Sequence, residues 1–333
     1  MSKLAKRSRE WILIGIILLI VVVVSCISPQ FLSMRNIQNI LRANSINGIM
    51  ALGMMFLIIT GNIDVSVGAS MMMCGGVFTT VVLQRMPDES FFGYIAVFGL
   101  AIIVGIVIGL ISGSFTTFLK LPSIVVTLGM YSVLSGSISI ATNGSWIINF
   151  PYWFTSMTAK KFLGVYVSIW IYAVIILLAY VLLNRLTLGR NILAYGGNHV
   201  SAKRAGLSEA RITLIAFAIM GATIGVSSVL LVSSNALFDP TAGSGYELDV
   251  IAIVILGGAA LSGGAATVAG TVLATILIGV MKNAIVMASV PIYYQKLVVG
   301  ATILFSVVSS AISESRRRAP ARKHKTIKGE AKA

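Results

Sequence analysis

The sequence predicts an all-α protein, a polytopic bundle of transmembrane helices, because it is strongly hydrophobic and repeats long apolar runs. Of its 333 residues 57% are hydrophobic and 11% are charged, and the mean hydropathy is +0.96. An average soluble domain carries about 25% charged residues. Runs of about 20 apolar residues, enough to cross a bilayer as a helix, recur between short polar breaks. Strands of a membrane barrel would instead alternate with a period of two residues.

In chain order, the apolar runs predict about ten spans with both ends of the chain in the cytoplasm. The predicted spans are 11–27, 45–60, 65–83, 92–118, 122–140, 162–183, 212–233, 248–261, 267–287 and 293–312. The eighth run is too short for a straight crossing, so we expect a shortened or broken helix there. Segments 29–42 and 141–161 are expected outside the membrane.

The predicted organisation has three parts: a basic cytoplasmic amino terminus (1–10), a transmembrane domain (11–313) and a basic, disordered cytoplasmic tail (314–333). The formal charge of +15 is concentrated before the first span, in 184–211 and in the tail. This is the positive-inside pattern of cytoplasmic segments. It favours a protein surrounded by membrane lipid, with no nucleic acid bound, although a basic tail that contacts nucleic acid or anionic lipid is the minor alternative.

A polar break interrupts the apolar sequence at 61–68, which reads Gly-Asn-Ile-Asp-Val-Ser-Val-Gly. Charged residues inside a membrane are rare and often functional, and a broken helix is tolerated where it faces protein or a wet cavity. Two roles are open for Asp64 and Ser66. They cap the following helix, or they line a gate or translocation pathway together with Asn62, and both roles can hold at once.

Two acidic residues, Glu247 and Asp249, stand at the mouth of the short eighth run and are followed by glycine pairs at 257–258 and 263–264. Glycine-interrupted half-helices are how many transporters build a passage near the middle of the membrane. Acids at a helix start also stabilise the helix dipole. Both interpretations of Glu247 and Asp249, a passage and stabilisation of the helix dipole, remain open at this point.

The cytoplasmic stretch 184–211 is much longer than a connection between two spans needs to be, and we expect a short helix near 200–205. Its length and mixed character predict a docking surface, with a solvated basic loop as the alternative. No Cys, His or carboxylate partner lies at metal-binding spacing from His199, so no metal site is expected.

Small residues recur four apart in three runs, which are Ala101 to Gly113, Gly221 to Gly225 and Ala266 to Ala274. Such rows let membrane helices approach closely, and we interpret them as packing surfaces and not as a substrate path.

Together these segments resemble the sugar branch of the bacterial ATP-binding-cassette importer permeases, the group that includes ribose, xylose, arabinose, galactose and autoinducer-2 permeases. The resemblance covers 31–312 and rests on four motifs in the family's order. They are 61–68, 122–129 (Pro-Ser-Ile-Val-Val-Thr-Leu-Gly, which contains Thr127), 189–206 and 245–264. Asn62 replaces the family's usual second glycine, as in some autoinducer-2 permeases.

The resemblance implies a transport subunit of the bacterial plasma (inner) membrane. Its cytoplasmic loop would dock on a separate ATPase that binds ATP and Mg, a periplasmic binding protein would deliver the solute, and a second or sister permease would complete the pore. Coupling would fall to Gly189, Arg190, Asn191, Tyr195, Gly196, Gly197, Asn198, Ala205 and Gly206, and the pathway or gate to Asn62, Asp64, Ser66, Thr127, Glu247 and Asp249. The expected solute is a pentose, a hexose or an autoinducer-2 furanose, with branched-chain amino acids or nucleosides as the alternative.

The chain holds no Gly-x-x-x-x-Gly-Lys-(Ser/Thr) loop, so we expect no cofactor in it and no ATP hydrolysis by it. Two rivals remain. An ion-coupled secondary transporter would use Asp64 and Asp249 as ion sites but has no need of a large docking loop. A membrane enzyme would need a nucleophile, a base and an orienting group, which the sequence does not bring together.

Overall fold

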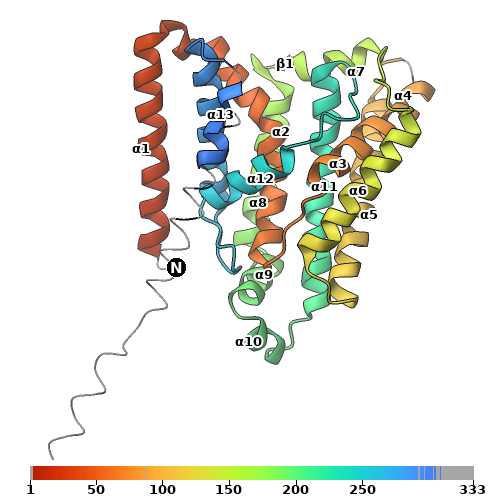
Figure 1. Ribbon diagram of the computed structural model, residues 1–333, viewed down its shortest axis with the longest axis vertical. Coiled ribbons are helices and arrows are strands. Elements are labelled where there is room, and N and C mark those ends of the chain that lie inside the picture. Colours follow the sequence, from red (N-terminus) through yellow and green to blue (C-terminus); the bar gives the residue numbers. More distant parts are fainter. Residues whose placement is uncertain are drawn as a thin grey trace, which may run out of the picture.

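Helices dominate the computed structural model, which describes residues 3–86, 88–291, 293–295, 297–302, 304 and 308 (Figure 1). Within these residues, eight helices are long and apolar enough to cross a membrane. These spans are Glu10–Ile27, Met34–Ile59, Val67–Arg85, Phe91–Phe118, Ser123–Thr142, Val167–Asn184, Glu209–Asn235 and Val268–Met287. The predicted fold class, an all-α polytopic bundle, is confirmed. The predicted tail and several residues of the predicted tenth span lie outside the described residues.

The first half of the chain forms α1 (Lys3–Ile27), α2 (Met34–Ile59), α3 (Val67–Met72), α4 (Thr79–Arg85), α5 (Phe91–Phe118), α6 (Ser123–Thr142) and the short α7 (Tyr152–Ser156). A π-helical turn, Met73–Phe78, joins α3 to α4, and 3-10 turns cover Pro29–Leu32 and Met157–Ala159. The second half contains the hairpin β1 (Lys161–Phe162) and β2 (Val165–Tyr166), then α8 (Val167–Asn184), α9 (Thr187–Gly197), α10 (His199–Arg204), α11 (Glu209–Asn235), α12 (Tyr246–Leu256) and α13 (Val268–Met287).

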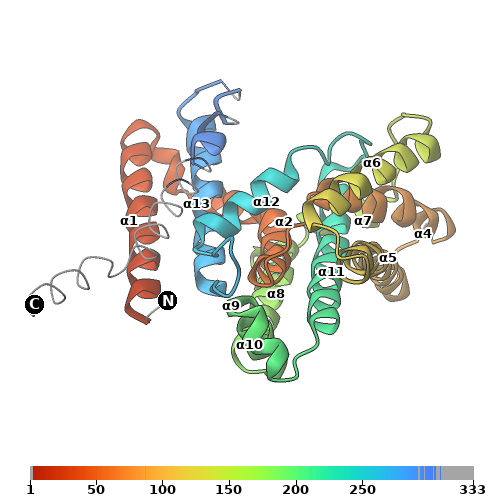
Figure 2. The ribbon, with the colours of Figure 1, turned by 60° about the horizontal axis from the view of Figure 1, so that its bottom comes forward.

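Helices α2 and α11 form the centre of the bundle. In the most apolar window of each span, 83% of residues are buried in α2 and 78% in α11, against 11% in α1. A helix that is apolar on all sides is suited to such a central position. Helix α1 lies at one edge beside α13, which agrees in both views (Figure 1, Figure 2). Its exposed apolar side chains are those of a helix in contact with lipid.

The molecule has two ends that matter for function. Helices α9 and α10 lie at one end, called here the α9 end, and α7 with β1 lies at the opposite end, called the α7 end (Figure 1). Helix α12 starts part-way between them. With 11 residues it is about 16 Å long, whereas the apolar core of a bilayer is about 30 Å thick. The predicted shortened eighth helix is therefore confirmed.

Three sequence-based boundaries were wrong. Most of 29–42, expected as an outer loop, is helical, because α2 already begins at Met34 and is capped by Ser33, whose side chain accepts from the Asn36 N–H. The start of the sixth predicted span is the β1–β2 hairpin, so the helix begins only at Val167. The long stretch 184–211 contains two helices, α9 and α10, of which only α10 was expected.

The small-residue rows are packing surfaces, as predicted. A β carbon on Gly105 of α5 would overlap the carbonyl oxygen of Gly221 in α11, and one on Gly221 would overlap the carbonyl oxygen of Gly105. The same close approach joins Gly225 to Ala101, and Gly270 of α13 to Gly257. Backbones that meet this closely leave no room for a side chain at these glycines.

We expect Gly105→Ala to lower the melting temperature of the detergent-solubilised chain clearly, because its methyl group must push α5 away from α11. Gly99 lies on the same helix with open space where a β carbon would stand. Gly99→Ala is thus the matched control, and it should leave the melting temperature unchanged or raise it through better helix propensity. Equal melting temperatures for the two variants would contradict the proposed contact.

Candidate functional site

Within the polar break after α2, short hydrogen bonds join Asp64 to Ser66. One carboxylate oxygen of Asp64 accepts from the Ser66 N–H at 2.8 Å and from the Ser66 hydroxyl at 2.6 Å. Asp64 is 2% exposed and Ser66 is fully buried. Ser66 occupies the N-cap position of α3, but its hydroxyl donates to Asp64 and does not cap the helix. Asp64 therefore stabilises the turn that leads into α3.

Helix α6 supplies the remaining partners of this break. The Ile63 N–H donates to the Ser123 hydroxyl oxygen at 3.1 Å, and the Val65 N–H donates to the Thr127 hydroxyl oxygen at 3.0 Å. Thr127 is fully buried. The motif at 122–129 thus satisfies backbone groups that the broken helix at 61–68 leaves free, which is how a break is tolerated inside a membrane.

The end of α2 is where the other two motifs meet. The Ile59 carbonyl oxygen accepts from the Gly264 N–H at 2.8 Å. A β carbon on Gly196 of α9 would overlap the same oxygen, and one on Gly264 would lie 2.5 Å from the Cα of Gly197. All four motifs therefore converge between Ile59 and Gly68, although they are spread over about 200 residues of the sequence.

A cavity of about 760 Å³ opens at the α9 end beside this junction. It is lined by the break, by the α5–α6 connection and by α9, and its polar walls include Asn62, Ser123, Tyr195, His199 and Glu209. The Asn62 amide donates to the Thr60 hydroxyl at 3.0 Å. Burial, with the Glu209 carboxylate as the second cause, raises the pKa of Tyr195 to about 12, so its phenol stays neutral at physiological pH.

The predicted coupling residues divide into a buried and an exposed set. Gly189, Tyr195 and Gly196 are buried and hold α9 against α8 and α2. The exposed set comprises Arg190, Gly197, Asn198, Ala205 and Gly206, while Asn191 is half-buried. Asn198 caps α10 by accepting from the Ser201 N–H at 2.9 Å, and Gly206 ends that helix with a left-handed φ of 83°. The exposed set gives the α9 end a surface that is open to solvent in the described part of the chain.

The two predicted acids at the start of α12 differ in their partners. One oxygen of Glu247 accepts from the Gly245 N–H at 3.0 Å, as expected for an acid that stabilises a helix start. Asp249 forms an ion pair with Lys282 of α13. Gly68, the last residue of the break motif, lies against the Gly243 backbone and the Glu247 side chain. The break and the half-helix are therefore one assembly.

Reasoning from the sequence missed Lys282, Ser123 and Asn47, which all border this assembly. Lys282 could have been found from the sequence, because it is the only charged residue in the predicted span 267–287 and charged residues inside a membrane are often functional. Ser123 and Asn47 carried none, since uncharged polar residues are common in membrane helices.

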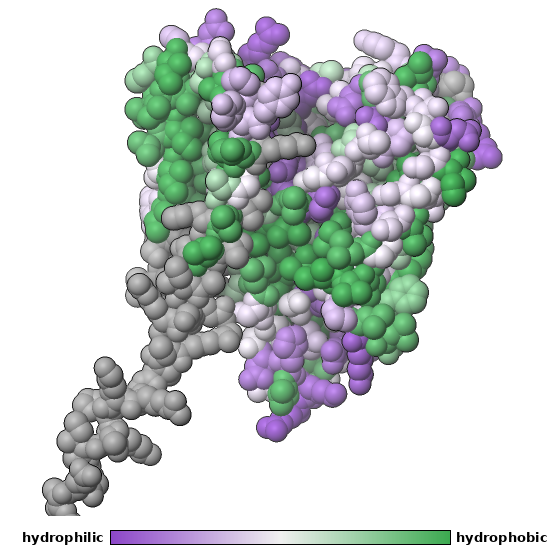
Figure 3. All heavy atoms as spheres, viewed as in Figure 1, coloured by the Kyte–Doolittle hydropathy of each residue, from purple (hydrophilic) through white to green (hydrophobic). Residues whose placement is uncertain are grey.

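Helix α6 has a second face that contacts nothing else in the described part of the chain. Thr127, Leu134 and Ile138 are buried on one side. The opposite side carries an exposed row of small and polar residues, Gly129, Ser132, Gly136 and Ser139, flanked by the exposed apolar side chains of Val125, Val133 and Ile140. No described atom lies within 4 Å of a β carbon placed at Gly129 or Gly136. In Figure 3 the region over α6 is pale toward the α7 end and green toward the start of the helix, whereas α1 is green along most of its length. Small polar rows of this kind are typical of helix interfaces in membranes.

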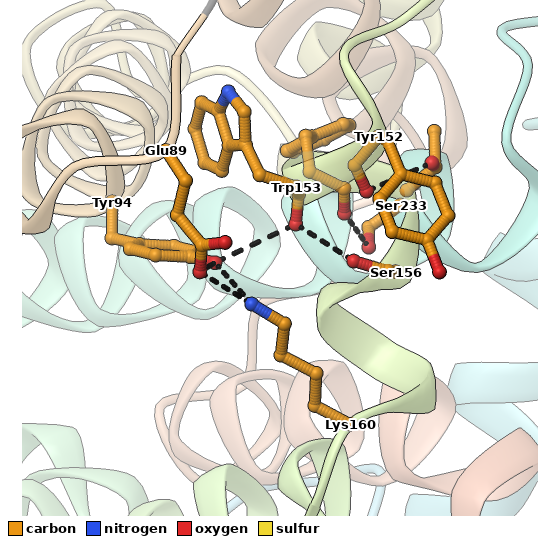
Figure 4. Close-up of polar contacts among 9 residues, drawn as sticks. Glu89, Tyr94, Tyr152, Trp153, Ser156, Lys160 and Ser233 are labelled. Atoms are coloured by element: carbon orange, nitrogen blue, oxygen red, sulfur yellow. Dashed lines mark hydrogen bonds and ion pairs between the residues drawn. The ribbon is translucent and has the colours of Figure 1, made fainter.

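A polar brace ties the α7 end together (Figure 4). Lys160 forms an ion pair with Glu89, and the Tyr94 hydroxyl donates to the same carboxylate at 2.8 Å. The hydrogen bond from Lys160 holds the pKa of Glu89 below its ordinary value, and the same bond raises the pKa of Lys160. The Tyr94 ring meets the Trp153 ring edge-on at 4.8 Å. The brace joins the connection before α5 to the surface helix α7.

Comparison with known proteins identifies the family. The family described as the branched-chain amino acid transport system permease component matches residues 36–307. The chain belongs to this permease family. The permease is 32% identical to the ribose import permease of Escherichia coli, over 88% of the chain and 90% of that relative. It is 32% identical to an L-arabinose ABC transporter permease of Azospirillum brasilense, over 94% and 92%.

An autoinducer-2 import permease of Salmonella typhi is 29% identical, over 91% of the chain and 86% of that relative. No solved structure matches the permease. The resemblance read from the four motifs is confirmed. The permease is a transport subunit of the ABC importer class and a multi-pass protein of the inner membrane.

We expect Thr127→Val to destabilise the permease by about 1–3 kcal/mol, because it leaves the buried Val65 N–H without its acceptor while it preserves the shape of the side chain. Thr127→Ser keeps the hydroxyl group and should recover most of this loss. Ser132→Ala removes a hydroxyl from the exposed face of the same helix and should change stability by no more than about 0.5 kcal/mol. Reversible unfolding in mixed micelles measures all three, and equal stability of Thr127→Val and Ser132→Ala would contradict the assignment.

Proposed function

We propose that the permease is the membrane-spanning subunit of an ATP-driven importer for a monosaccharide or a sugar-like solute, such as a pentose, a hexose or an autoinducer-2 furanose. The names of its relatives support this solute class, since they describe ribose and autoinducer-2 import and an arabinose transporter. Branched-chain amino acids, which the family description names, and nucleosides are the alternative solutes.

One observation carries the mechanism. The α9 helix, the break after α2 and the loop after α12 share backbone contacts around the Ile59 carbonyl oxygen, with no flexible side chain between them. A force applied to α9 is therefore transmitted directly to both polar interruptions of the membrane domain. A separate cytoplasmic ATPase that binds ATP and Mg would supply this force by closing on the exposed surface of α9 and α10.

The remaining partners follow from the two ends and from α6. The α7 end faces the periplasm and receives solute from a binding protein, and the brace between Glu89 and Lys160 keeps that surface in shape. A second permease subunit packs on the exposed row of α6, so that the two copies enclose a pathway bordered by the breaks. Asn62, Asp64, Ser66, Thr127, Glu247 and Asp249 act at its gate. Asp64, Ser66, Thr127 and Glu247 support this role because they hold the break and the half-helix in one arrangement.

Reconstitution in liposomes with the cognate ATPase and binding protein tests the function. We expect uptake of radiolabelled ribose, arabinose or galactose that requires ATP on the side of the membrane to which the α9 end is exposed. An imposed proton or sodium gradient should not change this uptake. Uptake by the permease alone on an ion gradient would establish the secondary-transporter alternative. Uptake of leucine in place of every sugar would replace the proposed solute class.

Coupling is tested at Gly197, where a β carbon would meet open space, unlike at Gly196. We expect Gly197→Glu and Arg190→Glu to leave insertion and melting temperature intact but to abolish most sugar uptake, because they place a new negative charge on the docking surface. ATP hydrolysis by the assembled complex should then no longer respond to the loaded binding protein.

Gly196→Ala is the matched comparison for that experiment. It should lower the melting temperature through its clash with Ile59, and thus separate damage to the fold from loss of coupling. Normal uptake and normal ATPase stimulation in Gly197→Glu and Arg190→Glu would remove the docking role from α9.

A further inference from the structure

A second cavity, of about 520 Å³, lies beside the start of the half-helix. Its volume is within the range of small-molecule sites. Polar side chains from four separate segments line it, namely Asn47 of α2, Ser244 before α12, Glu247 and Asp249 of α12, Lys282 of α13 and Gln295 beyond α13. Leu248 and Val299 add apolar walls. The cavity is distinct from the one at the α9 end.

Charged groups at this depth need a reason, because the surrounding bundle is apolar and desolvation is costly. Asp249 and Lys282 neutralise each other as an ion pair. The Gln295 amide donates to the Lys282 carbonyl oxygen at 3.3 Å and so fixes the backbone next to the pair. The pair stabilises the contact between α12 and α13, but this does not account for the further polar atoms on the same cavity wall.

Two of the residues that line this cavity, Asn47 and Glu247, each carry a buried acceptor oxygen without a partner among the described residues. Asn47 is 7% exposed, and its side-chain oxygen accepts no hydrogen bond from any residue that the structure describes. The second carboxylate oxygen of Glu247 is likewise buried without a donor among the described residues. Buried polar atoms are nearly always paired in native proteins, so unpaired acceptors at a cavity point to a ligand that brings donors.

The balance of groups defines the chemistry of that ligand. Asn47, Glu247 and Asp249 offer acceptor oxygens, and the Lys282 ammonium and the Asn47 amide offer donors. An anion would meet two carboxylates, and an apolar molecule would leave the free oxygens of Asn47 and Glu247 without donors. Hydroxyl groups both donate and accept, so several hydroxyls on one small ring satisfy acceptors and donors together.

We propose that this cavity is a binding subsite inside the permease for a neutral polyhydroxylated ring, held by Asn47, Glu247 and the Asp249 and Lys282 pair. The inference rests on the proposed function, which it deepens by giving the permease its own contact with the solute. Glu247 also touches Gly68, so a ligand that engages this carboxylate acts on the wall of the polar break.

Protection of a single cysteine tests the subsite in the full-length chain in lipid nanodiscs. Cys26 and Cys74 are replaced by alanine, and Ser244→Cys places an exposed thiol on the cavity wall. The alkylation rate with N-ethylmaleimide is measured with D-ribose, L-arabinose, D-galactose or L-leucine. We expect at least one sugar to slow alkylation saturably, by about fivefold when its concentration is about four times its Kd. Leucine should give no protection.

Controls make the outcome specific. Ser145→Cys, in the exposed connection after α6, should react at the same rate with and without sugar. Asn47→Leu and, independently, Glu247→Gln should each abolish most of the protection of the Ser244→Cys thiol. Glu247→Gln keeps the length of the side chain, so it still tests the subsite if the Asn47→Leu variant fails to fold.

Lack of protection by all three sugars, equal protection at position 145, or unchanged protection in both cavity variants would overturn the subsite. ATP-driven sugar uptake combined with any of these results would remove the subsite and leave the proposed function standing. Protection by a sugar without ATP-driven uptake would support the subsite and contradict the proposed function. Protection by leucine alone would overturn the polyhydroxylated ligand.

Discussion

The structure depends on a close approach of three backbones at the carbonyl oxygen of Ile59. That oxygen belongs to the last turn of α2, where carbonyl groups lack partners within the helix, and it accepts from the Gly264 N–H. Gly196 of α9 lies so close that a methyl group would not fit. Because α2 is the most buried span, this contact fixes the two interrupted segments and the α9 surface to the centre of the bundle.

This constraint explains why the polar interruptions are placed where they are. A broken helix exposes backbone groups that lipid does not satisfy. Here Ser123 and Thr127 of α6 satisfy the break, and Gly68 allows the half-helix α12 to lie directly against it. Gly68, Gly196 and Gly264 are thus contact points between backbones. Polar residues of the same motifs donate or accept the hydrogen bonds that the broken helix needs.

Much of this arrangement was predictable from the sequence, and the features that were not predicted were missed for identifiable physical reasons. Bulk hydrophobicity gave the fold class, and the run 248–261 gave the half-helix because its length is directly readable. Helix α9 was missed, since its glycines at 189, 196 and 197 lower helix propensity. Gly189 packs against α8 and Gly196 against α2, and these contacts depend on the tertiary structure. The convergence of motifs on Ile59 is likewise a property of the tertiary structure.

The acids of α12 show the same limit more sharply. The sequence places Glu247 and Asp249 two residues apart and offers the same two explanations, a passage and the helix dipole, for both. In the structure their environments differ. Asp249 has a partner in Lys282, whereas one oxygen of Glu247 accepts from its own helix start and the other is buried next to Gly68 with no donor among the described residues. A charge that is already compensated needs no ligand, but an uncompensated acceptor beside a cavity does. The distinction that matters for transport therefore lies in the second oxygen of Glu247, and spacing along the chain carries no information about it.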